Sequence, residues 1–491
     1  MTKKYLSHLT IILAATIASF IVVSCSTSSN TIVVKNAPVS SQKPDTTAAQ
    51  NQGGTEFQEL TIGENQPIHS LDPLFIENTS EMQAVQLVYE GLVRYDASGK
   101  IIPAMARSWT VSDNHKIYRF TLKHNLFYQD SDVFSSGRGR RVVAGDIKKD
   151  FQRMATDSVP DHAARLFMDI RGFEPYYQEQ HKVFRKSARQ LHGISGIKVE
   201  NDSTIVFSLV QPDDHFLQKL ASPFAVIYPP ESAKAKKFEA VGTGPFRFSQ
   251  QRSDSLYIFA RFNNYSGPKP KLNRVDMVTS GSEKSLLKAV SRGQIDLLPE
   301  LGPQQIQQIS NASGNLKKEI DNNLQLIQDG GQLAYILRYN SGADTPESAV
   351  TGALSSVQAS DFFQYLPPNS FRMQWLFQRS QGRQSADSLS APYTGSPFLG
   401  SFYSQLSSQL KKRSITFSMD SSRVRNRNIP IYADRFFEFS NRDIKSADMP
   451  LLRITFTTEA LVRKSVRHVP FNKFNWWIDL RNTTTSSSDS R

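Results

Sequence analysis

The residue types that perform covalent chemistry do not fall into a catalytic pattern in this sequence. Ser285 and Lys288 have the Ser-x-x-Lys spacing of a serine nucleophile with a lysine base, but no Ser-Asp-Asn or Lys-Thr-Gly follows them. The nine histidines show no His-Glu-x-x-His or other paired metal spacing, and no Gly-x-Ser-x-Gly turn is present. We therefore predict that the protein is not an enzyme and holds no metal or other cofactor.

The one cysteine, Cys25, stands directly after an apolar run from Leu9 to Val23. A lysine-containing start followed by a short apolar run is typical of a signal peptide, which we assign to residues 1–24. A single cysteine cannot form an internal disulfide. Ser24 before the cysteine resembles the bacterial lipobox, which implies that Cys25 becomes the first mature residue and carries lipid, palmitate included. The alternative is a cysteine at the end of an uncleaved anchor helix.

Residues 25–55 are rich in Ser, Thr, Asn, Gln and Ala and have no apolar periodicity. Such a segment cannot bury enough surface to offset its ordering entropy, so we predict a flexible tether that reaches about 30 Å. The chain carries a net charge of +13. For a lipoprotein this indicates no nucleic-acid partner, and either a diffuse surface bias or attraction to an anionic membrane surface.

Helix- and strand-forming patterns fill the body of the chain. Leu71–Val93 is predicted as a turn, a loop and an amphipathic helix that Thr79 or Ser80 caps. Strands are predicted at 57–63, 117–122 and 204–209, and Ala144–Met154 places Ile147, Phe151 and Met154 on one helical face. Gly242 and Gly244 flank a tight bend, which lacks the Lys-Ser/Thr of a phosphate loop.

The order of these segments resembles the family 5 extracellular solute-binding proteins, which are the oligopeptide-, dipeptide- and nickel-binding components of ABC importers. The resemblance runs from Leu-Asp-Pro at 71–73 through the segments EGLVRYDASGKIIPAMARSW, KIYRFTLKHNLFYQDS and VVAGDIKKDFQRM to Gly-Thr-Gly-Pro-Phe at 242–246. Val133–Arg140 reads as an inserted basic loop. Beyond Asn340 the resemblance to this family becomes weak.

The resemblance implies an α/β, two-lobed fold of the periplasmic-binding-protein type (type II, the large peptide-binder subclass) with an extra small subdomain. Lobe I is predicted at 56–98, 200–278 and 457–482, and the subdomain at 99–199. Lobe II is predicted at 279–456, divergent and shortened, and a disordered tail at 483–491. Leu451–Phe456 and Val466–Leu480 are predicted as strands that return to lobe I.

The implied function is capture of oligopeptides or dipeptides in the cleft between the lobes and delivery to the permease subunits of an ABC transporter. The implied location is the cell envelope, with a monomeric body in the periplasm or at the cell surface and a lipid anchor in the membrane. The resemblance implies backbone contacts to the peptide at Glu77, Asn78 and Thr79, whose alternative reading is a plain cap and turn.

Two alternatives stay open. The same fold could bind a metal chelate, a sugar or a signalling peptide, or serve as a non-transport envelope protein with a degenerate cleft. The most basic stretch is either a solvated helix end and loop or a membrane- or ligand-facing patch; it comprises Lys411, Lys412, Arg413, Arg423, Arg425 and Arg427.

Overall fold

The computed structural model describes most of the chain beyond the predicted tether. The described residues are 57–320, 323–328, 332–367, 370–377, 386–392, 396–420, 431–436, 449–457, 459–469 and 479–485. The predicted signal peptide, Cys25, the tether and Arg423, Arg425 and Arg427 lie outside them. Within the described residues, no helix has the length and apolarity that a membrane span requires.

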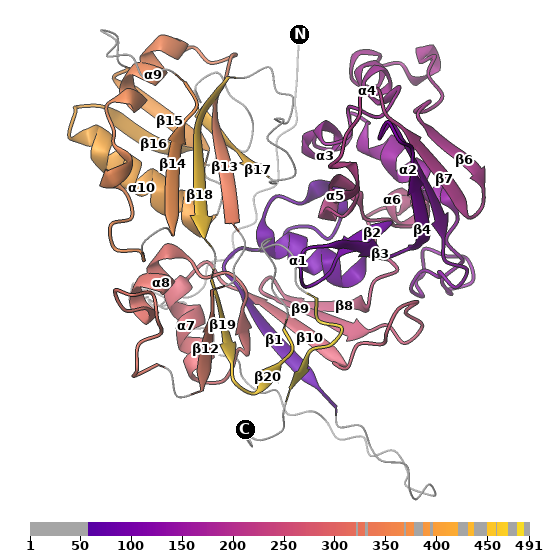
Figure 1. Ribbon diagram of the computed structural model, residues 1–491, viewed down its shortest axis with the longest axis horizontal. Helices are drawn as coiled ribbons and strands as arrows, with labels where there is room; N and C mark the ends of the chain where they lie inside the picture. The colour runs from indigo at the N-terminus through magenta and orange to yellow at the C-terminus, as the bar shows by residue number, and fades with distance from the viewer. Residues whose placement is uncertain are drawn as a thin grey trace, which may run out of the picture. The chain divides into compact units, whose positions relative to one another are not determined.

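The largest sheet, called the central sheet below, is mixed and has seven strands. Several of its strands, β1 among them, are labelled in the lower part of Figure 1. β1 lies between β11 and β10 and is parallel to both, while the other neighbouring pairs are antiparallel. The strands in spatial order are β12 (Leu324–Ile327), β19 (Ala460–Arg463), β11 (Leu297–Leu298), β1 (Glu59–Glu64), β10 (Arg274–Thr279), β9 (Leu256–Arg261) and β8 (Phe246–Ser253). The predicted first strand thus lies at the centre of this sheet.

A four-stranded antiparallel sheet is built from strands between residues 106 and 208. Its order is β4 (Ala106–Val111), β5 (Ile117–Leu122), β7 (Thr204–Ser208) and β6 (Ile197–Asn201). In its core, Phe207 of β7 packs edge to face with Phe120 of β5 and with Phe151 of helix α2 (Ala144–Met154). Because β7 pairs with both β5 and β6, the predicted boundary at 199 separates strands that belong to one sheet.

A second four-stranded sheet holds most of the strands after residue 330. Its order is β14 (Phe371–Trp375), β18 (Pro450–Thr457), β13 (Gln332–Tyr339) and β17 (Ile431–Phe436). β18 pairs along its length with β13 and β14, so the prediction that Leu451–Phe456 returns to the first lobe is wrong. The parallel pair β15 (Ser388–Pro392) and β16 (Thr416–Asp420) lies close to helix α10 (Pro397–Lys411).

The remaining elements are short connectors. The helices are η1 (Pro73–Phe75), α1 (Thr79–Val88), α3 (His162–Arg165), α4 (Phe173–Lys182), η2 (Lys186–Ala188), α5 (Phe216–Leu220), η3 (Pro223–Ala225), α6 (Pro230–Lys234), α7 (Glu283–Ser291), α8 (Pro303–Ile309), α9 (Glu347–Ser355) and η4 (Ala359–Asp361). The strands are β2 (Val93–Tyr95), β3 (Ile101–Pro103), β20 (Val466–Arg467) and β21 (Thr484–Thr485). Because β21 pairs with β20, Thr484 and Thr485 are ordered, although the disordered tail was predicted from residue 483.

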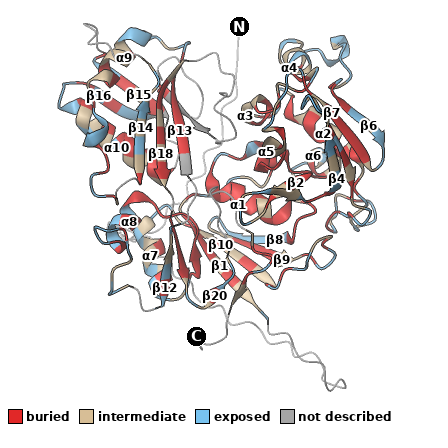
Figure 2. Cartoon of the chain, in the orientation of Figure 1, coloured by how far each residue is buried: buried red, intermediate tan, exposed pale blue. Residues whose placement is uncertain are grey.

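Two hydrophobic cores meet at the central sheet. Leu297 of β11 and its partner Val462 of β19 belong to one core, which extends through the N-terminal half of the chain. Leu298 and its partner Leu461 belong to the other core, which extends from Leu286 onward. Since successive strand residues point to opposite faces, the two faces of this sheet serve different cores. Figure 2 shows these central strands largely buried.

Candidate functional site

The Leu-Asp-Pro turn is held by a buried ion pair. Asp72 caps η1 by accepting a hydrogen bond from the Leu74 N–H at 3.2 Å. Its two carboxylate oxygens accept from both terminal nitrogens of Arg153 on α2, at 2.9 and 2.5 Å. Arg153 also donates to the Tyr228 hydroxyl at 2.8 Å and lies over the rings of Tyr228 and Phe238. The turn is therefore fixed to the subdomain by a bidentate, aromatic-shielded pair.

Asn78 caps α1, so the prediction of Thr79 or Ser80 as the cap is wrong. Its Oδ1 accepts from the Glu81 N–H at 3.0 Å, and its Nδ2 donates to the Pro67 carbonyl at 2.9 Å. An amide can accept and donate at once, whereas a hydroxyl at Thr79 would sit one position too late to reach the same orphan N–H. Asn78 thus ties both ends of the loop 65–78 together.

The buried Glu81 carboxylate closes the same loop from inside. It accepts hydrogen bonds from the His69 N–H at 2.8 Å and the Glu77 N–H at 2.6 Å. Burial raises the pKa of Glu81, and these two backbone donors act against that rise. Thr79 donates its N–H to Gln66 Oε1 at 3.2 Å. The loop is therefore preorganised by its own polar groups.

The three predicted ligand contacts lie together at the start of α1 but differ in exposure. Glu77 is exposed, whereas Asn78 and Thr79 are buried, with 6% and 2% of their surface exposed. The side chain of Asn78 and the backbone N–H groups of Glu77 and Thr79 bond within the loop. Of the three, Glu77 is thus the residue whose side chain reaches solvent, and the other two shape the surface beneath it.

Sequence reasoning missed a group of buried carboxylates at the carboxyl end of the parallel strands. Glu64 ends β1 with 2% of its surface exposed, and Glu300 follows β11 with 6% exposed. Burial raises the pKa of Glu64 to about 8; the Ser80 hydroxyl, which donates to it at 2.8 Å, lowers it, and nearby Glu300 raises it. Burial likewise raises the pKa of Glu459, before β19, to about 7.

Amide side chains connect this edge to the elements around it. Asn65 Nδ2 donates to the Glu300 carbonyl at 2.6 Å and to Gln305 Oε1 at 3.1 Å. The backbone N–H of Gln305 in turn donates to the Glu283 carboxylate at 3.1 Å. The carboxyl ends of parallel strands are where open α/β sheets bind ligands. A glutamate that ends a strand, as in Ile-Gly-Glu64, was the sequence signal for this edge.

The Gly-Thr-Gly-Pro bend packs directly on the end of α1. The Gly244 N–H donates to the Val88 carbonyl at 2.8 Å, and the Gly242 N–H donates to Gln129 Oε1 at 3.2 Å. A Cβ at Gly244 would lie 2.6 Å from the Val88 carbonyl carbon, which no side chain tolerates. The two glycines are therefore required by close backbone contact, and the segment has a packing role.

The predicted inserted loop Val133–Arg140 is anchored at its end. Arg140 pairs with Asp146 at 2.8 Å and with Glu231 at 2.9 Å, and its guanidinium lies over the Tyr128 ring. These contacts give the last basic residue of the loop a structural role.

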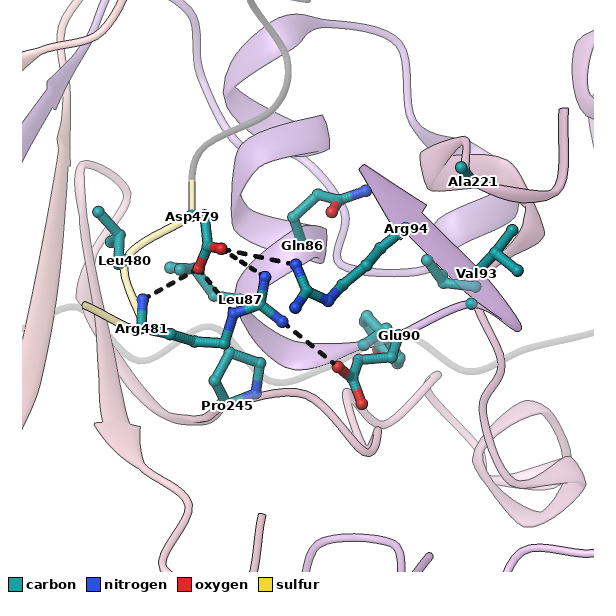
Figure 3. A pocket seen from close by; sticks show the side chains of 13 residues that line it. Gln86, Leu87, Glu90, Val93, Arg94, Ala221, Pro245, Asp479, Leu480 and Arg481 are labelled. Carbon is teal, nitrogen blue, oxygen red and sulfur yellow. Dashed lines mark hydrogen bonds and ion pairs between the residues drawn. The ribbon is translucent and has the colours of Figure 1, made fainter. Parts of the chain in front are cut away.

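Beside the end of α1, a cavity of about 30 Å³ is lined by an ion-pair cluster (Figure 3). Arg481 binds Asp479 through two hydrogen bonds of 2.7 and 2.5 Å, and Arg94 lies 3.7 Å from the same carboxylate. Burial raises the pKa of Glu90, while the Tyr265 hydroxyl, which donates to it at 2.5 Å, and Arg481 lower it. A cavity of this size has room for little more than a water molecule. The ion pairs link the segment that holds Asp479 and Arg481 to Glu90 and Arg94, which lie just after α1.

A larger groove, of about 800 Å³, lies away from these residues. It runs between α7, the segment after α8 and the pair β12–β19, with a floor of aliphatic side chains and with Lys284 and Lys288 at its rim. Ligand sites also need buried polar groups that orient the ligand. The lysines are exposed, so the groove by itself assigns no ligand. Within the described residues, no group of three or more His, Cys, Asp or Glu is arranged to hold a metal ion.

Comparison with known proteins establishes the family. Residues 100–347, about half of the chain, match the family described as bacterial extracellular solute-binding proteins, family 5 Middle. The chain belongs to this family, as the resemblance predicted.

Curated relatives match in part. The chain is 26% identical over 249 residues to the dipeptide-binding protein of Escherichia coli (strain K12), which covers 48% of this chain and 43% of that protein. It is 28% identical over 281 residues to heme-binding protein A of Haemophilus influenzae, covering 55% and 47%. The nickel-binding periplasmic protein of E. coli is 25% identical over 225 residues, covering 45% and 37%. The matched part thus spans less than half the length of each relative.

Solved structures show the fold. The murein tripeptide binding protein MppA of E. coli has a TM-score of 0.68 at 14% identity, covering 88% of this chain and 99% of that one. Haemophilus influenzae OppA in complex with the peptide RPPGFSPFR has the same TM-score, identity and coverage. The predicted fold class, an α/β periplasmic-binding-protein fold of the peptide-binding type, is confirmed.

Proposed function

We propose that this protein captures short peptides and delivers them to the permease subunits of an ABC importer, without making or breaking a bond. The observation that carries the proposal is the loop 65–78. Internal hydrogen bonds at Asn78 and Glu81 hold it rigid beside the carboxyl end of β1, and Glu77 stands exposed at its end. Rigid scaffolds that present a loop at this sheet edge are suited to ligand capture.

Peptide is the ligand class that the fold and the relatives support together. Two relatives are named for dipeptide binding and peptide transport, and a solved structure of the same fold holds a peptide. An extended peptide can be bound through its main chain, which makes affinity tolerant of its side chains. We place Glu77 in contact with it, with Asn78 and Thr79 holding that contact surface in position.

Anchoring by lipid on Cys25 completes the proposal. Several acyl chains on one residue hold a protein to a membrane durably, and residues 25–55 would let the monomeric body move in the periplasm or at the cell surface. Intact-mass measurement of the chain isolated from a bacterial membrane tests this part by itself. The expected mass is that of residues 25–491 plus acyl groups, and a Cys25→Ser chain that carries the same added mass would contradict it.

Native mass spectrometry tests the peptide assignment. The full chain is purified without denaturation and then mixed with a pool of short peptides. We expect co-purifying masses in the peptide range that the pool exchanges. A chain that stays empty, and that no peptide stabilises against heat, would overturn the assignment.

A second ligand class has its own supporting observation. Relatives with similar identity are named for heme and nickel binding. A co-purifying mass of a porphyrin or a metal chelate, in place of peptides, would favour this class within the same family.

A further inference from the structure

The loop after α4 presents a phenylalanine to solvent. Phe184 is 86% exposed, the most exposed large hydrophobic side chain in the described part of the chain. Leu191, near the other end of the same loop, is 40% exposed. Isolated apolar residues on a surface need no explanation, but two on one projecting loop raise the question of what covers them.

The loop is braced from within, so its shape does not depend on Phe184. Arg189 donates from Nε to the Val183 carbonyl and from Nη2 to the Gln180 carbonyl, both at 3.0 Å. The Glu179 carboxylate accepts from the N–H groups of Gln190 and Leu191, at 2.7 and 2.9 Å. These four bonds hold the backbone on both sides of the apolar tip. Phe184 is thus projected outward by a fixed frame.

Cations without acidic partners surround the tip. Lys182, Arg185 and Lys186 are exposed, and no hydrogen bond or ion pair of their side chains is found among the described residues. Two acids that contact this loop are already engaged, Glu179 with the loop backbone and Asp157 with Arg189 at 3.7 Å. The loop therefore combines an exposed aromatic ring with three uncompensated positive charges.

We propose that this loop, residues 182–191, contacts a bilayer that contains anionic lipids. Phe184 enters the headgroup region, where an aromatic ring exchanges water for acyl-chain contact, and the three cations bind lipid phosphates. Each cation near such a surface raises affinity about fivefold. The contact requires neither peptide capture nor the lipid on Cys25, although a tether to the same membrane would raise its effective concentration.

A probe at the tip tests the contact locally. Because Cys25 is the one cysteine of the chain, Cys25→Ser with Phe184→Cys gives the full chain a single thiol for an environment-sensitive NBD label. Vesicles of phosphatidylglycerol should raise and blue-shift the label's fluorescence, whereas vesicles of phosphatidylcholine should not. The control carries the label through Phe127→Cys, at a residue that is 46% exposed on a different loop.

Charge variants complete the test. Arg185→Gln with Lys186→Gln should weaken vesicle affinity about thirtyfold, since two charges are lost. Lys236→Gln with Lys237→Gln removes the same charge from exposed residues elsewhere and should leave affinity unchanged. A label response that is equal at positions 184 and 127, equal for both lipids, or unchanged by loss of Arg185 and Lys186 would overturn the proposal.

Discussion

The buried acid in the Leu-Asp-Pro turn and the buried acids at the edge of the central sheet are stabilised in opposite ways. On the side of the loop, Asp72 is paired with Arg153 through two hydrogen bonds. On the side of the sheet edge, Glu64 Oε1 and Glu459 Oε2 have no hydrogen-bond partner among the described residues, and burial raises the pKa of both side chains. The charge of Asp72 is compensated by a cation, whereas the raised pKa of Glu64 and of Glu459 favours their uncharged, protonated forms.

We call the Asp72–Arg153 pair the frame and the buried carboxyl groups of Glu64 and Glu459 the edge, because the two should respond differently to pH. A buried carboxylate with a bidentate arginine stays charged and fixes geometry, and removal of its partner is costly. A buried carboxyl without a cation exchanges a proton near neutral pH and so responds to its surroundings. The loop that carries Glu77 is attached to the frame and lies next to the edge. Four substitutions test this division.

The largest effect is expected when the frame loses its cation. Arg153→Met leaves Asp72 buried without its partner, so the free energy of unfolding should fall by about 3–5 kcal/mol. Urea denaturation followed by circular dichroism measures it. Arg247→Met, at an exposed residue of β8, is the control and should change stability by less than about 0.5 kcal/mol. A loss below about 1 kcal/mol for Arg153→Met would show that the pair is not what holds the turn.

The next effect is a pH dependence of folding stability that comes from Glu64. The folded state holds the Glu64 proton up to pH about 8, whereas the unfolded state releases it near 4.5. The folded chain thus binds more protons between these values, and stability falls as pH rises through them, by about 4 kcal/mol for this one group. Glu64→Gln keeps the acceptor for Ser80 and cannot ionise.

Thermal unfolding of both chains across pH 5 to 8 measures that contribution. The wild type should lose more stability than Glu64→Gln as pH rises, and the two should be close at pH 5. Parallel profiles would mean that Glu64 is ionised throughout, contrary to the pKa assigned to it.

A smaller loss of stability is expected when Asn78, the N-cap of α1, is replaced. Asn78→Ala removes the acceptor for Glu81 and the donor to Pro67, and should cost about 1–2 kcal/mol. Ser282→Ala removes the exposed cap of α7 and serves as the matched control, with a cost below about 1 kcal/mol. If the two variants unfold at the same urea concentration, Asn78 contributes nothing beyond an ordinary cap.

Glu77 should affect binding and leave folding unchanged. Because its side chain is exposed, Glu77→Ala should alter stability by less than about 0.5 kcal/mol. Loss of one polar contact to a peptide lowers affinity about two- to tenfold, which calorimetry with a captured peptide measures. Glu239→Ala, an exposed acid elsewhere, should leave affinity unchanged. Equal affinities for all three chains would remove Glu77 from the site.

Local sequence patterns predicted the positions of helices and strands well, but they predicted less well which strands pair with one another. Ile117–Leu122 and Ala144–Met154 were predicted at their observed bounds, because strict alternation and helical spacing are local properties. The destination of Leu451–Phe456 was wrong, since an apolar strand pattern fits either sheet and pairing with β13 is a long-range choice. The family and the fold class were predicted from the order of several segments, because no single motif among them is specific to the family.

The site was predicted in part for the same reason. The turn at Leu-Asp-Pro and the loop after it were visible as a pattern, but the capping role of Asn78 depends on the distant Pro67 carbonyl. The carboxylates Glu64, Glu300 and Glu459 are far apart in sequence and meet at neighbouring strands of one sheet. Charged residues in a sequence are read as exposed unless their surroundings are known, so their burial was not predictable.

Photo-crosslinking locates a bound peptide on the chain. A short peptide that carries benzoylphenylalanine is bound to the full chain, irradiated, and the adducts are mapped by tandem mass spectrometry. We expect adducts at Glu77 and its neighbours in residues 65–81, competed by unlabelled peptide. Competed adducts confined to other segments, or a peptide that leaves no adduct at all, would contradict it.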